Sequence, residues 1–393
     1  NLKNVISYES FIGDESSDYE WPDMDERSAA GLCYTSGTTG NPKGVLYSHR
    51  SSVLHAYAAL SPDVMNLGSR DCVLPVVPLF HVNAWGVPYA ALMAGAKLVM
   101  PGPKMGDGET LFNLIQQENV DLSLGVPTVW LALLQYADSV GKKLTKLDRT
   151  IIGGAAVPES MIKKFRDDHD VEVRQGWGMT EMSPLGTMST PKAGTEGMTE
   201  DELLKLRAKQ GRKIFGVEMR IVDDHGEELP WDGKAFGSLQ VRGPWICSDY
   251  FKLEGSSDTQ TDDGWFDTGD VATIDELGYM GITDRTKDVI KSGGEWISSI
   301  DVENMAMGHD SVAEAAVIGV PHPKWTERPI LIVIIADGKD LNKDEIISWL
   351  DGKIAKWWIP DDVVFVEEIP HTATGKIKKV ELRKQFADYK LPL

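Results

Sequence analysis

Cysteine is scarce in this sequence. Only Cys33, Cys72 and Cys247 occur among its 393 residues, and no two of them form a C-x-x-C pair. This number and spacing argue against a disulfide framework and against a zinc knuckle. We therefore expect a protein of a reducing compartment, the cytoplasm, where thiols stay free.

Long apolar runs are also absent. The longest candidate, residues 329–336, has the length of a strand, whereas about 20 apolar residues are needed to cross a bilayer. The sequence therefore predicts no membrane span. No signal peptide opens the chain, but because its first residue is Asn1, we expect the natural N-terminus and any targeting information to be missing.

Basic residues are few compared with acidic ones. The chain has 40 Lys and Arg against 60 Asp and Glu, which gives a net charge of −20. Such a charge disfavours nucleic acid or an anionic membrane as the main partner. A phosphate-bearing substrate would need a local reversal of sign, so lysine and arginine near glycine are the positions of interest.

The order of apolar runs predicts an α/β fold. In the first half, strand-like runs alternate with helical spacing at residues 109–117 and 128–137, which favours layers on a largely parallel sheet. The expected strands are residues 71–77, 96–100, 122–126, 149–152 and 171–174. Short strands with Gly and Asp turns follow, as in residues 216–222 and 237–242, and predict a β-rich subdomain over about 212–284.

The pattern changes again after Arg285. Short α and β runs at residues 301–305, 312–320, 330–336, 343–350 and 363–366 predict a small α+β domain of normal size. The charged segment 284–288 has no large apolar side chain, which suits an exposed hinge. We therefore predict an N-terminal domain over 1–286, a hinge at Lys287 and a mobile C-terminal domain over 287–393. The basic run 376–384 can be explained as a solvated face.

The most informative stretch is Tyr34-Thr35-Ser36-Gly37-Thr38-Thr39-Gly40-Asn41-Pro42-Lys43-Gly44. It lies directly before an amphipathic run, residues 45–60. Its glycines let backbone N–H groups face an anion, while its hydroxyls and lysine add hydrogen bonds and charge. It is not a Walker A motif, because Lys43 follows proline and precedes glycine. The alternative is an ordinary Ser/Gly surface loop.

Two further loops follow expected strands. The small residues from Gly153 to Ala156 can let a flat ring lie at the carboxyl end of a strand, although a tight turn explains them equally well. Residues 175–181, Gln-Gly-Trp-Gly-Met-Thr-Glu, end in a hydroxyl that can bond phosphate and a carboxylate that can help hold Mg²⁺. An isolated glutamate is more often a surface charge.

Three more sites each allow a functional interpretation and an ordinary structural one. Asp270 can accept ribose hydroxyls with Arg285 nearby, or can belong to a hairpin corner. His81 and Trp85 lie four apart at the entry of an expected helix and would share one face, although each is commonly structural. Lys376 ends a small-residue loop and can reach a transferring phosphate, or is a plain solvated lysine.

In this order and spacing, the motifs resemble the adenylate-forming (AMP-binding) superfamily, which includes acyl-CoA synthetases, firefly luciferase and the adenylation domains of peptide synthetases. The segments 33–35, 46–50 and 81–86 are similar to bacterial short- and medium-chain fatty-acyl-CoA ligases. The resemblance covers nearly the whole chain. About 150 residues that the family carries before the phosphate loop are absent, so we expect the first subdomain to be incomplete.

The resemblance implies a role for each motif. The phosphate loop, with Thr35, Ser36, Gly37, Thr38, Thr39, Gly40 and Lys43, would hold the β- and γ-phosphates of ATP. The adenine would lie among Gly154, Ala155, Ala156, Gln175, Gly176, Trp177, Gly178 and Met179. Thr180 would meet the α-phosphate, and Glu181 with Thr35 would bind Mg²⁺. Asp270 and Arg285 would hold the ribose, and Lys376 would be the adenylation lysine. His81, Trp85 and Gly153 would contact the acyl group, and the CoA tunnel would be bordered by Lys291, Ser292, Gly293, Gly294 and Trp296.

The implied activity is ligation of a carboxylic acid, such as 3-methylmercaptopropionate, to CoA through an acyl-adenylate, with release of pyrophosphate and AMP. The sequence offers no Ser-His-Asp or Cys-His arrangement, and none is needed, because the thiol of CoA is the nucleophile. Two alternatives stay open: transfer to a carrier-protein thiol, and an ATP-binding regulator with a dead site. The family is often dimeric, so a homodimer is a further expectation.

Overall fold

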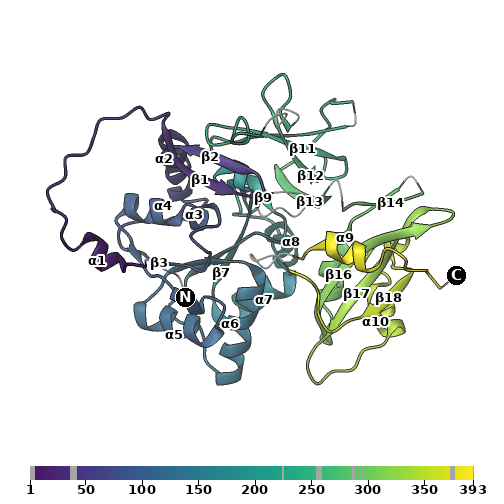
Figure 1. The fold of residues 1–393 in the computed structure, drawn as a ribbon. Helices are drawn as coiled ribbons and strands as arrows, with labels where there is room; N and C mark the ends of the chain where they lie inside the picture. Colours follow the sequence, from purple (N-terminus) through teal and green to yellow (C-terminus); the bar gives the residue numbers. More distant parts are fainter. Residues whose placement is uncertain are drawn as a thin grey trace.

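The computed structural model describes residues 5–35, 42–223, 225–253, 259–285, 288–293, 295–371 and 377–392. A large domain lies beside a small one, and an N-terminal arm with α1 (Tyr8–Ile12) runs away from both (Figure 1). The arm leads into β1 (Ala29–Tyr34), which pairs antiparallel with β2 (Gly44–Ser48) as a separate two-stranded sheet.

A parallel sheet forms the centre of the large domain. Its strands are, in spatial order, β4 (Lys97–Leu98), β3 (Cys72–Pro75), β5 (Leu122–Gly125), β6 (Arg149–Ile152) and β7 (Glu172–Gly178). All four pairings between them are parallel. Strands β3, β5 and β6 are buried along their whole length, as expected for parallel strands that are covered on both faces. The predicted α/β class with a largely parallel sheet in the first half is confirmed.

Helices cover both faces of this sheet (Figure 1). One face packs against α5 (Gly108–Glu118), α6 (Pro127–Val140) and α7 (Glu159–His169), and the other packs against α2 (His49–Leu60) and α4 (Val87–Ala94). Asp107 begins α5 by accepting a hydrogen bond from the Thr110 N–H. Gly108 is required where α5 meets α6, because a Cβ there would lie 2.3 Å from the carbonyl oxygen of Ala132.

The sheet continues with antiparallel strands beyond β7. In spatial order these are β8 (Leu185–Met188), β9 (Gly211–Lys213), β13 (Tyr279–Arg285), β12 (Phe266–Ile274), β11 (Phe236–Arg242) and β10 (Glu218–Val222). Helix α8 (Glu200–Arg207) lies between β8 and β9 in sequence and has a capping box formed by Thr199 and Glu202. The large domain thus joins a covered parallel half to an antiparallel half, and β7 lies at the junction.

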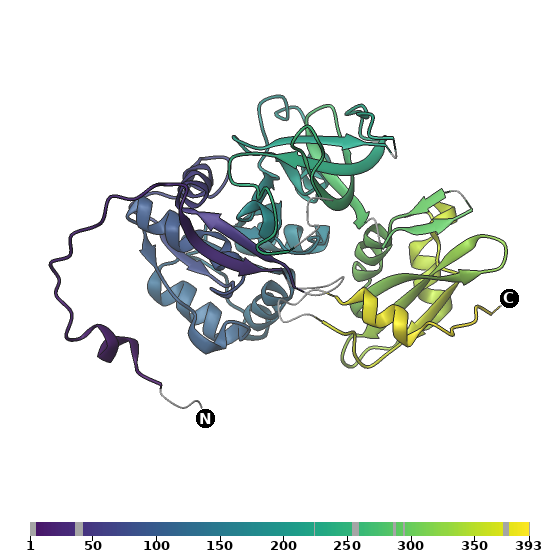
Figure 2. The ribbon, with the colours of Figure 1, turned by 45° about the horizontal axis from the view of Figure 1, so that its top comes forward.

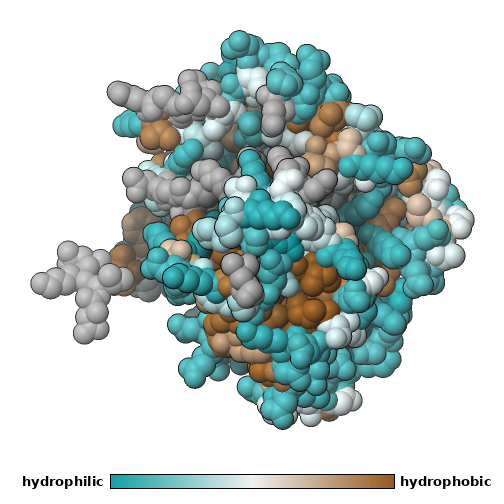
Figure 3. Space-filling view, turned by 90° about the vertical axis from the view of Figure 1, so that its right-hand side faces the viewer, coloured by the Kyte–Doolittle hydropathy of each residue, from teal (hydrophilic) through white to brown (hydrophobic). Residues whose placement is uncertain are grey.

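The small domain has its own core. Its strands are β14 (Ile290–Ser292), β15 (Glu295–Ile297), β16 (Val312–His322), β17 (Thr326–Ile335) and β18 (Asp362–Phe365), and its helices are α9 (Ser299–Met307), α10 (Lys343–Leu350) and α11 (Lys379–Gln385). The sheet order is β15-β14-β17-β16, with β18 paired to β17. Alternate residues of β16 and β17 pack into two apolar clusters, one on each face. Seen from the side, the molecule is mainly hydrophilic with a hydrophobic area near the centre of the view (Figure 3).

Two boundaries predicted from sequence are wrong. The amphipathic run 45–60 begins as strand β2 and becomes helical only at His49, because Ser48 and Ser51 form a capping box there. Strand β7 does not end at residue 174 but continues to Gly178 and pairs with β8. Its glycines fit this pairing, since a Cβ on Gly178 would lie 2.0 Å from the carbonyl oxygen of Pro184.

The expected helix after His81 is a left-handed turn instead. The backbone φ is positive at every residue of α3 (Val82–Trp85), between 48° and 59°. Left-handed backbone costs about 1–2 kcal/mol for each residue with a side chain, so the surroundings must hold it in place. Val82 and Ala84 are buried, and the Cys33 thiol donates to Asn83 Oδ1 at 3.6 Å. Backbone strain of this kind is concentrated at functional sites.

Candidate active site

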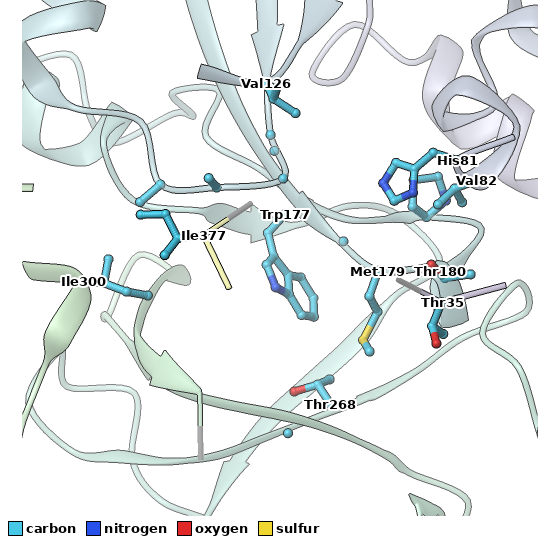
Figure 4. Close-up of a pocket in the computed structure, with 18 of the residues that line it drawn as sticks. Thr35, His81, Val82, Val126, Trp177, Met179, Thr180, Thr268, Ile300 and Ile377 are labelled. Atoms are coloured by element: carbon cyan, nitrogen blue, oxygen red, sulfur yellow. The ribbon is translucent and has the colours of Figure 1, made fainter. Parts of the chain in front are cut away.

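A cavity of about 950 Å³ lies where the carboxyl ends of β5, β6 and β7 face α9 and the beginning of α11. In Figure 4, Trp177 and Met179 lie in its middle, with His81 and Thr35 on one side and Ile300 and Ile377 on the other. Open α/β sheets bind their ligands at such strand ends. Most predicted site residues that the structure describes line this one cavity.

The ends of the predicted phosphate loop are joined to each other. The Thr35 N–H donates to the Lys43 carbonyl at 2.9 Å, and the Lys43 N–H donates to the Thr35 hydroxyl at 3.0 Å. Both residues line the cavity. Ser36, Gly37, Thr38, Thr39 and Gly40 lie outside the described residues. The two ends of the loop therefore meet at one point on the cavity wall.

Small residues at the ends of β6 and β7 form a slot in the cavity wall. Gly153, Gly154, Ala155, Ala156, Gly176 and Gly178 all line it. A Cβ on Gly153 would lie 2.9 Å from the Gly176 carbonyl oxygen, so the ends of β6 and β7 approach each other too closely for a side chain there. This shape fits a flat base. Gln175 lies behind the wall, where its Oε1 accepts from the Val157 N–H at 3.2 Å and so supports the 153–158 turn.

Thr180 and Glu181 are buried in the short helix η2 (Thr180–Met182), at the cavity wall. The Tyr250 hydroxyl donates to Glu181 Oε1 at 2.6 Å, and the Tyr47 hydroxyl donates to the Thr180 carbonyl at 2.6 Å. Burial, with Cys33 and Glu181 nearby, raises the pKa of Tyr47, which keeps its phenol protonated as a donor.

The donor set suits Mg²⁺ better than a softer metal. Thr35 and Glu181 present oxygen to the cavity, and Mg²⁺ usually binds through one or two carboxylates together with substrate phosphates. Among the residues that the structure describes, no three His, Cys, Asp or Glu gather as a complete metal site. Any Mg²⁺ here would thus take most of its oxygen ligands from phosphates and water.

The predicted ribose carboxylate does not reach the cavity wall directly. Asp270 lies behind Trp177 and accepts a hydrogen bond from its Nε1 at 3.0 Å, with both residues buried. The wall is formed there by Asp267, Thr268 and Gly269. Asp270 is paired with Arg285 across β12 and β13, so the two predicted ribose residues are neighbours in the sheet.

The predicted acyl residues meet at an apolar part of the wall. His81, Trp85 and Gly153 all line the cavity, although the left-handed turn rather than a shared helical face brings the first two together. The indole of Trp85 packs on Gly153, since a Cβ added to Gly153 would lie 3.3 Å from Trp85 Cη2. Other lining residues here are apolar: Met65, Leu124, Ile151 and Met188.

The small domain closes the cavity with α9 and residues 377–380. Lys376 lies outside the described residues. The residues on either side of that gap, His371 and Ile377, are neighbours because they form a β-bridge. Lys287 and Gly294 also lie outside it. Lys291, Ser292 and Gly293 are described and do not line the cavity, and Trp296 is placed by its backbone pairing with Lys291.

Beside this wall lies an ionic cluster that the sequence did not reveal. Lys379 pairs with Glu303 at 2.7 Å, and their side chains are 11% and 13% exposed. Ser299 donates to Asp284 Oδ2 at 2.6 Å and links the cluster to β13. Burial raises the pKa of Glu303 to about 7 in spite of the opposing effect of Lys379. The description of the basic run 376–384 as a solvated face is therefore wrong at Lys379, because buried acidic groups face it.

The family models decide the relationship. Residues 3–251 match the model for AMP-binding enzyme, and residues 301–376 match the AMP-binding enzyme C-terminal domain. The chain belongs to the AMP-binding enzyme family. Of the motifs in the described part, the ends of the phosphate loop, the turns at residues 153–156 and 176–181, and His81 with Trp85 line one cavity, whereas Asp270 and the residues expected to border CoA do not.

Curated relatives of this AMP-binding enzyme are CoA ligases. It is 55% identical to 3-methylmercaptopropionyl-CoA ligase of Ruegeria lacuscaerulensis, over 97% of this chain and 70% of that one. Medium-chain-fatty-acid–CoA ligase of Ectopseudomonas oleovorans is 52% identical over 98% and 70%. Long-chain-fatty-acid–CoA ligase of Thermus thermophilus is 49% identical over 98% and 71%.

Solved structures share its fold. Anthranilate CoA ligase AuaEII in complex with anthranoyl-AMP has a TM-score of 0.85 and 25% identity, over 96% of this chain and 71% of that one. MenE of Bacillus subtilis in complex with ATP and magnesium has a TM-score of 0.79 and 25% identity, over 95% and 74%. The predicted adenylate-forming fold, a large domain with a small C-terminal domain, is confirmed, and so is the predicted enzyme class, the AMP-forming acid–thiol ligases.

In the described part of the chain, no helix is both long and apolar enough to cross a membrane.

Proposed function

We propose that this enzyme activates short- or medium-chain carboxylic acids with ATP and transfers them to CoA, with 3-methylmercaptopropionate and medium-chain fatty acids as candidate substrates. The observation that supports this proposal best is the contact of Trp85 with Gly153, because it places an indole ring at the apolar end of the cavity. The two relatives named for such acids support this choice. The relative named for long-chain acids makes chain length the point to test.

In the first half-reaction, a carboxylate oxygen of the acid attacks the α-phosphorus of ATP. The bond from that phosphorus to the bridging oxygen breaks, and pyrophosphate leaves. Because both reactants are anionic, the site must offset the developing negative charge. Lys43, in the phosphate loop, would act on the β- and γ-phosphates, and Lys376 on the α-phosphate. Thr35 and Glu181 would hold Mg²⁺, which when bound neutralises phosphate oxygens.

The nucleoside would lie between the two small-residue turns. Gly154, Ala155 and Ala156 would cover one side of the adenine, and Gly176, Trp177, Gly178 and Met179 would border the rest, since these residues line the slot. Asp270 and Arg285 would hold the ribose only after the Trp177 indole has moved aside, because Asp270 lies behind that ring and Asp267, Thr268 and Gly269 form the wall. Asp270 also fixes the indole of Trp177, so its loss would disturb the adenine slot as well.

In the second half-reaction, the CoA thiol attacks the acyl carbonyl, loses its proton, and AMP leaves. The described residues proposed for CoA, Lys291 to Gly293 with Trp296, belong to the β14–β15 hairpin. The parts of the small domain that line the cavity are instead α9, residues 314–315 of β16 and residues 377–380. Figure 2 shows the small domain beside the large one. Rotation of a C-terminal domain, residues 287–393, about Lys287 would exchange the two faces.

The test is pyrophosphate release and thioester formation, measured on the full-length enzyme with acids of increasing length, with and without CoA. We expect pyrophosphate release with short and medium acids, and acyl-CoA only when CoA is present. Transfer to a carrier-protein thiol in place of CoA would show a carrier-loading ligase. No pyrophosphate release with any acid would refute the ligase assignment and favour an ATP-binding regulator.

A further inference from the structure

Tyr250 contacts both charged groups of the phosphate end of the cavity. Its hydroxyl donates to Glu181 Oε1 at 2.6 Å, and the Lys43 ammonium lies 4.5 Å from the centre of its ring. The latter distance is that of a cation–π contact. Tyr250 is 7% exposed and Glu181 is 6% exposed, so their contact lies in a buried environment where electrostatic interactions are strong, whereas Lys43 is half-buried.

We propose that Tyr250 is a positioning residue that keeps Lys43 and Glu181 apart, so that one stays available for the phosphates of ATP and the other for the metal. The proposal rests on the proposed function of this site. The lysine is attracted to the ring face, and the carboxylate to the hydroxyl at the ring edge. Within the described part of the chain, no ion pair joins Lys43 and Glu181, although both line the same cavity.

The separation has a physical consequence. A buried carboxylate without a cation is costly, and a nearby ammonium would pair with it if nothing lay between them. Such a pair would neutralise the two groups that must meet MgATP. Tyr250 gives the ammonium a cation–π contact and the carboxylate a hydrogen bond, and each is weaker than an ion pair. Phosphates and metal can therefore replace these contacts more easily than they could break an ion pair.

The backbone fixes Tyr250 between its two partners. The Phe251 N–H donates to the Gly44 carbonyl at 2.8 Å, next to Lys43, and the Cys247 N–H donates to the Glu181 carbonyl at 2.8 Å. The loop that carries Tyr250 is therefore tied to both segments.

The sharpest test removes the ring and asks whether the effect depends on the carboxylate. ATP binding is measured by calorimetry on the full-length enzyme in EDTA, for wild type, Tyr250→Leu, Glu181→Gln and the double variant. Tyr250→Leu should lower the affinity for ATP about 10-fold, because Lys43 then pairs with Glu181. When Glu181 is already Gln, the same substitution should change the affinity for ATP less than about twofold. Equal losses in both backgrounds would overturn the proposal, because a merely structural tyrosine gives additive effects.

A second variant keeps the ring and removes only the hydroxyl. Tyr250→Phe should leave ATP affinity in EDTA within roughly twofold of wild type but raise the Mg²⁺ concentration for half-maximal ATP–pyrophosphate exchange by about 10-fold, the usual effect of losing a partner of a metal ligand. Tyr279→Phe is the matched control, since it removes a partly buried hydrogen bond from the tyrosine hydroxyl to the Thr190 carbonyl elsewhere in the domain and should change neither value. An unchanged Mg²⁺ requirement in Tyr250→Phe would count against the proposal. Wild type that binds no ATP at all would instead refute the proposed function.

Discussion

Replacing Trp85 with glycine tests which residue limits the length of the acid. The indole contacts Gly153, and Ile151 and Met188 share the apolar wall, so removing the indole opens volume that is bounded by apolar side chains. Glycine is the suitable replacement because φ at Trp85 is 59°, where glycine is unstrained. The variant should therefore enlarge the pocket without disturbing the left-handed turn.

The size of the effect follows from the transfer of methylene groups. Each methylene that moves from water into an apolar site contributes about 0.8 kcal/mol, so admitting two more should raise the relative kcat/KM of a longer acid roughly 15-fold. The wild-type enzyme should prefer four- or eight-carbon acids to a sixteen-carbon acid. In Trp85→Gly, the optimum should move toward longer acids, while the four-carbon acid loses contact with the indole and reacts more slowly.

The assay compares kcat/KM for acyl-CoA formation with acids of four, eight and sixteen carbons at fixed ATP and CoA. Trp21→Gly is the control, because Trp21 is 84% exposed in the N-terminal arm and its loss should leave the ratios unchanged. A wild-type preference for the sixteen-carbon acid would refute the reasoning. So would a Trp85→Gly variant whose ratios stay within twofold of wild type.

Three further predictions concern the two half-reactions and pH. Lys376→Ala should slow acyl-adenylate formation by roughly 10²-fold or more but leave conversion of supplied acyl-adenylate to thioester almost normal; equal losses in both steps would show a structural lysine. Lys287→Pro, which fixes φ near −65°, should preserve the pyrophosphate burst and sharply reduce acyl-CoA formation, and normal values for both would place the hinge elsewhere. Burial lowers the pKa of His55 to about 4, and its Nε2 accepts from the Leu185 N–H. Between about pH 6.5 and about pH 4, the imidazole of His55 is protonated in the unfolded state but not in the folded state. From pH 7.5 to 5.5, the free energy of unfolding of the wild type should therefore fall by about 1.3 kcal/mol more than that of His55→Gln, as measured by urea unfolding. A difference between the two proteins that is constant with pH would contradict this.

Elements with a strong local pattern could be predicted closely from sequence. Strand β6 (Arg149–Ile152) and helix α10 (Lys343–Leu350) have the predicted bounds, because a short apolar run and a regular helical spacing are properties of neighbouring residues. The turn at α3 (Val82–Trp85) could not be predicted in this way. Its left-handed backbone is held by the burial of Val82 and Ala84 and by the contact with Cys33, which lies far away in sequence.

The sequence by itself determined the family and the candidate chemistry. The phosphate loop that ends at Lys43, the carboxylate of Glu181 and their order along the chain are local features, and they suffice to indicate an enzyme that handles ATP. Only the tertiary structure decided how these groups are arranged. It places Tyr250 against Glu181, 69 positions away, and Asp270 behind Trp177, 93 positions away. The reason is physical: periodicity and propensity act over a few residues, whereas the electrostatics of a buried site depend on contacts that form only when the chain packs.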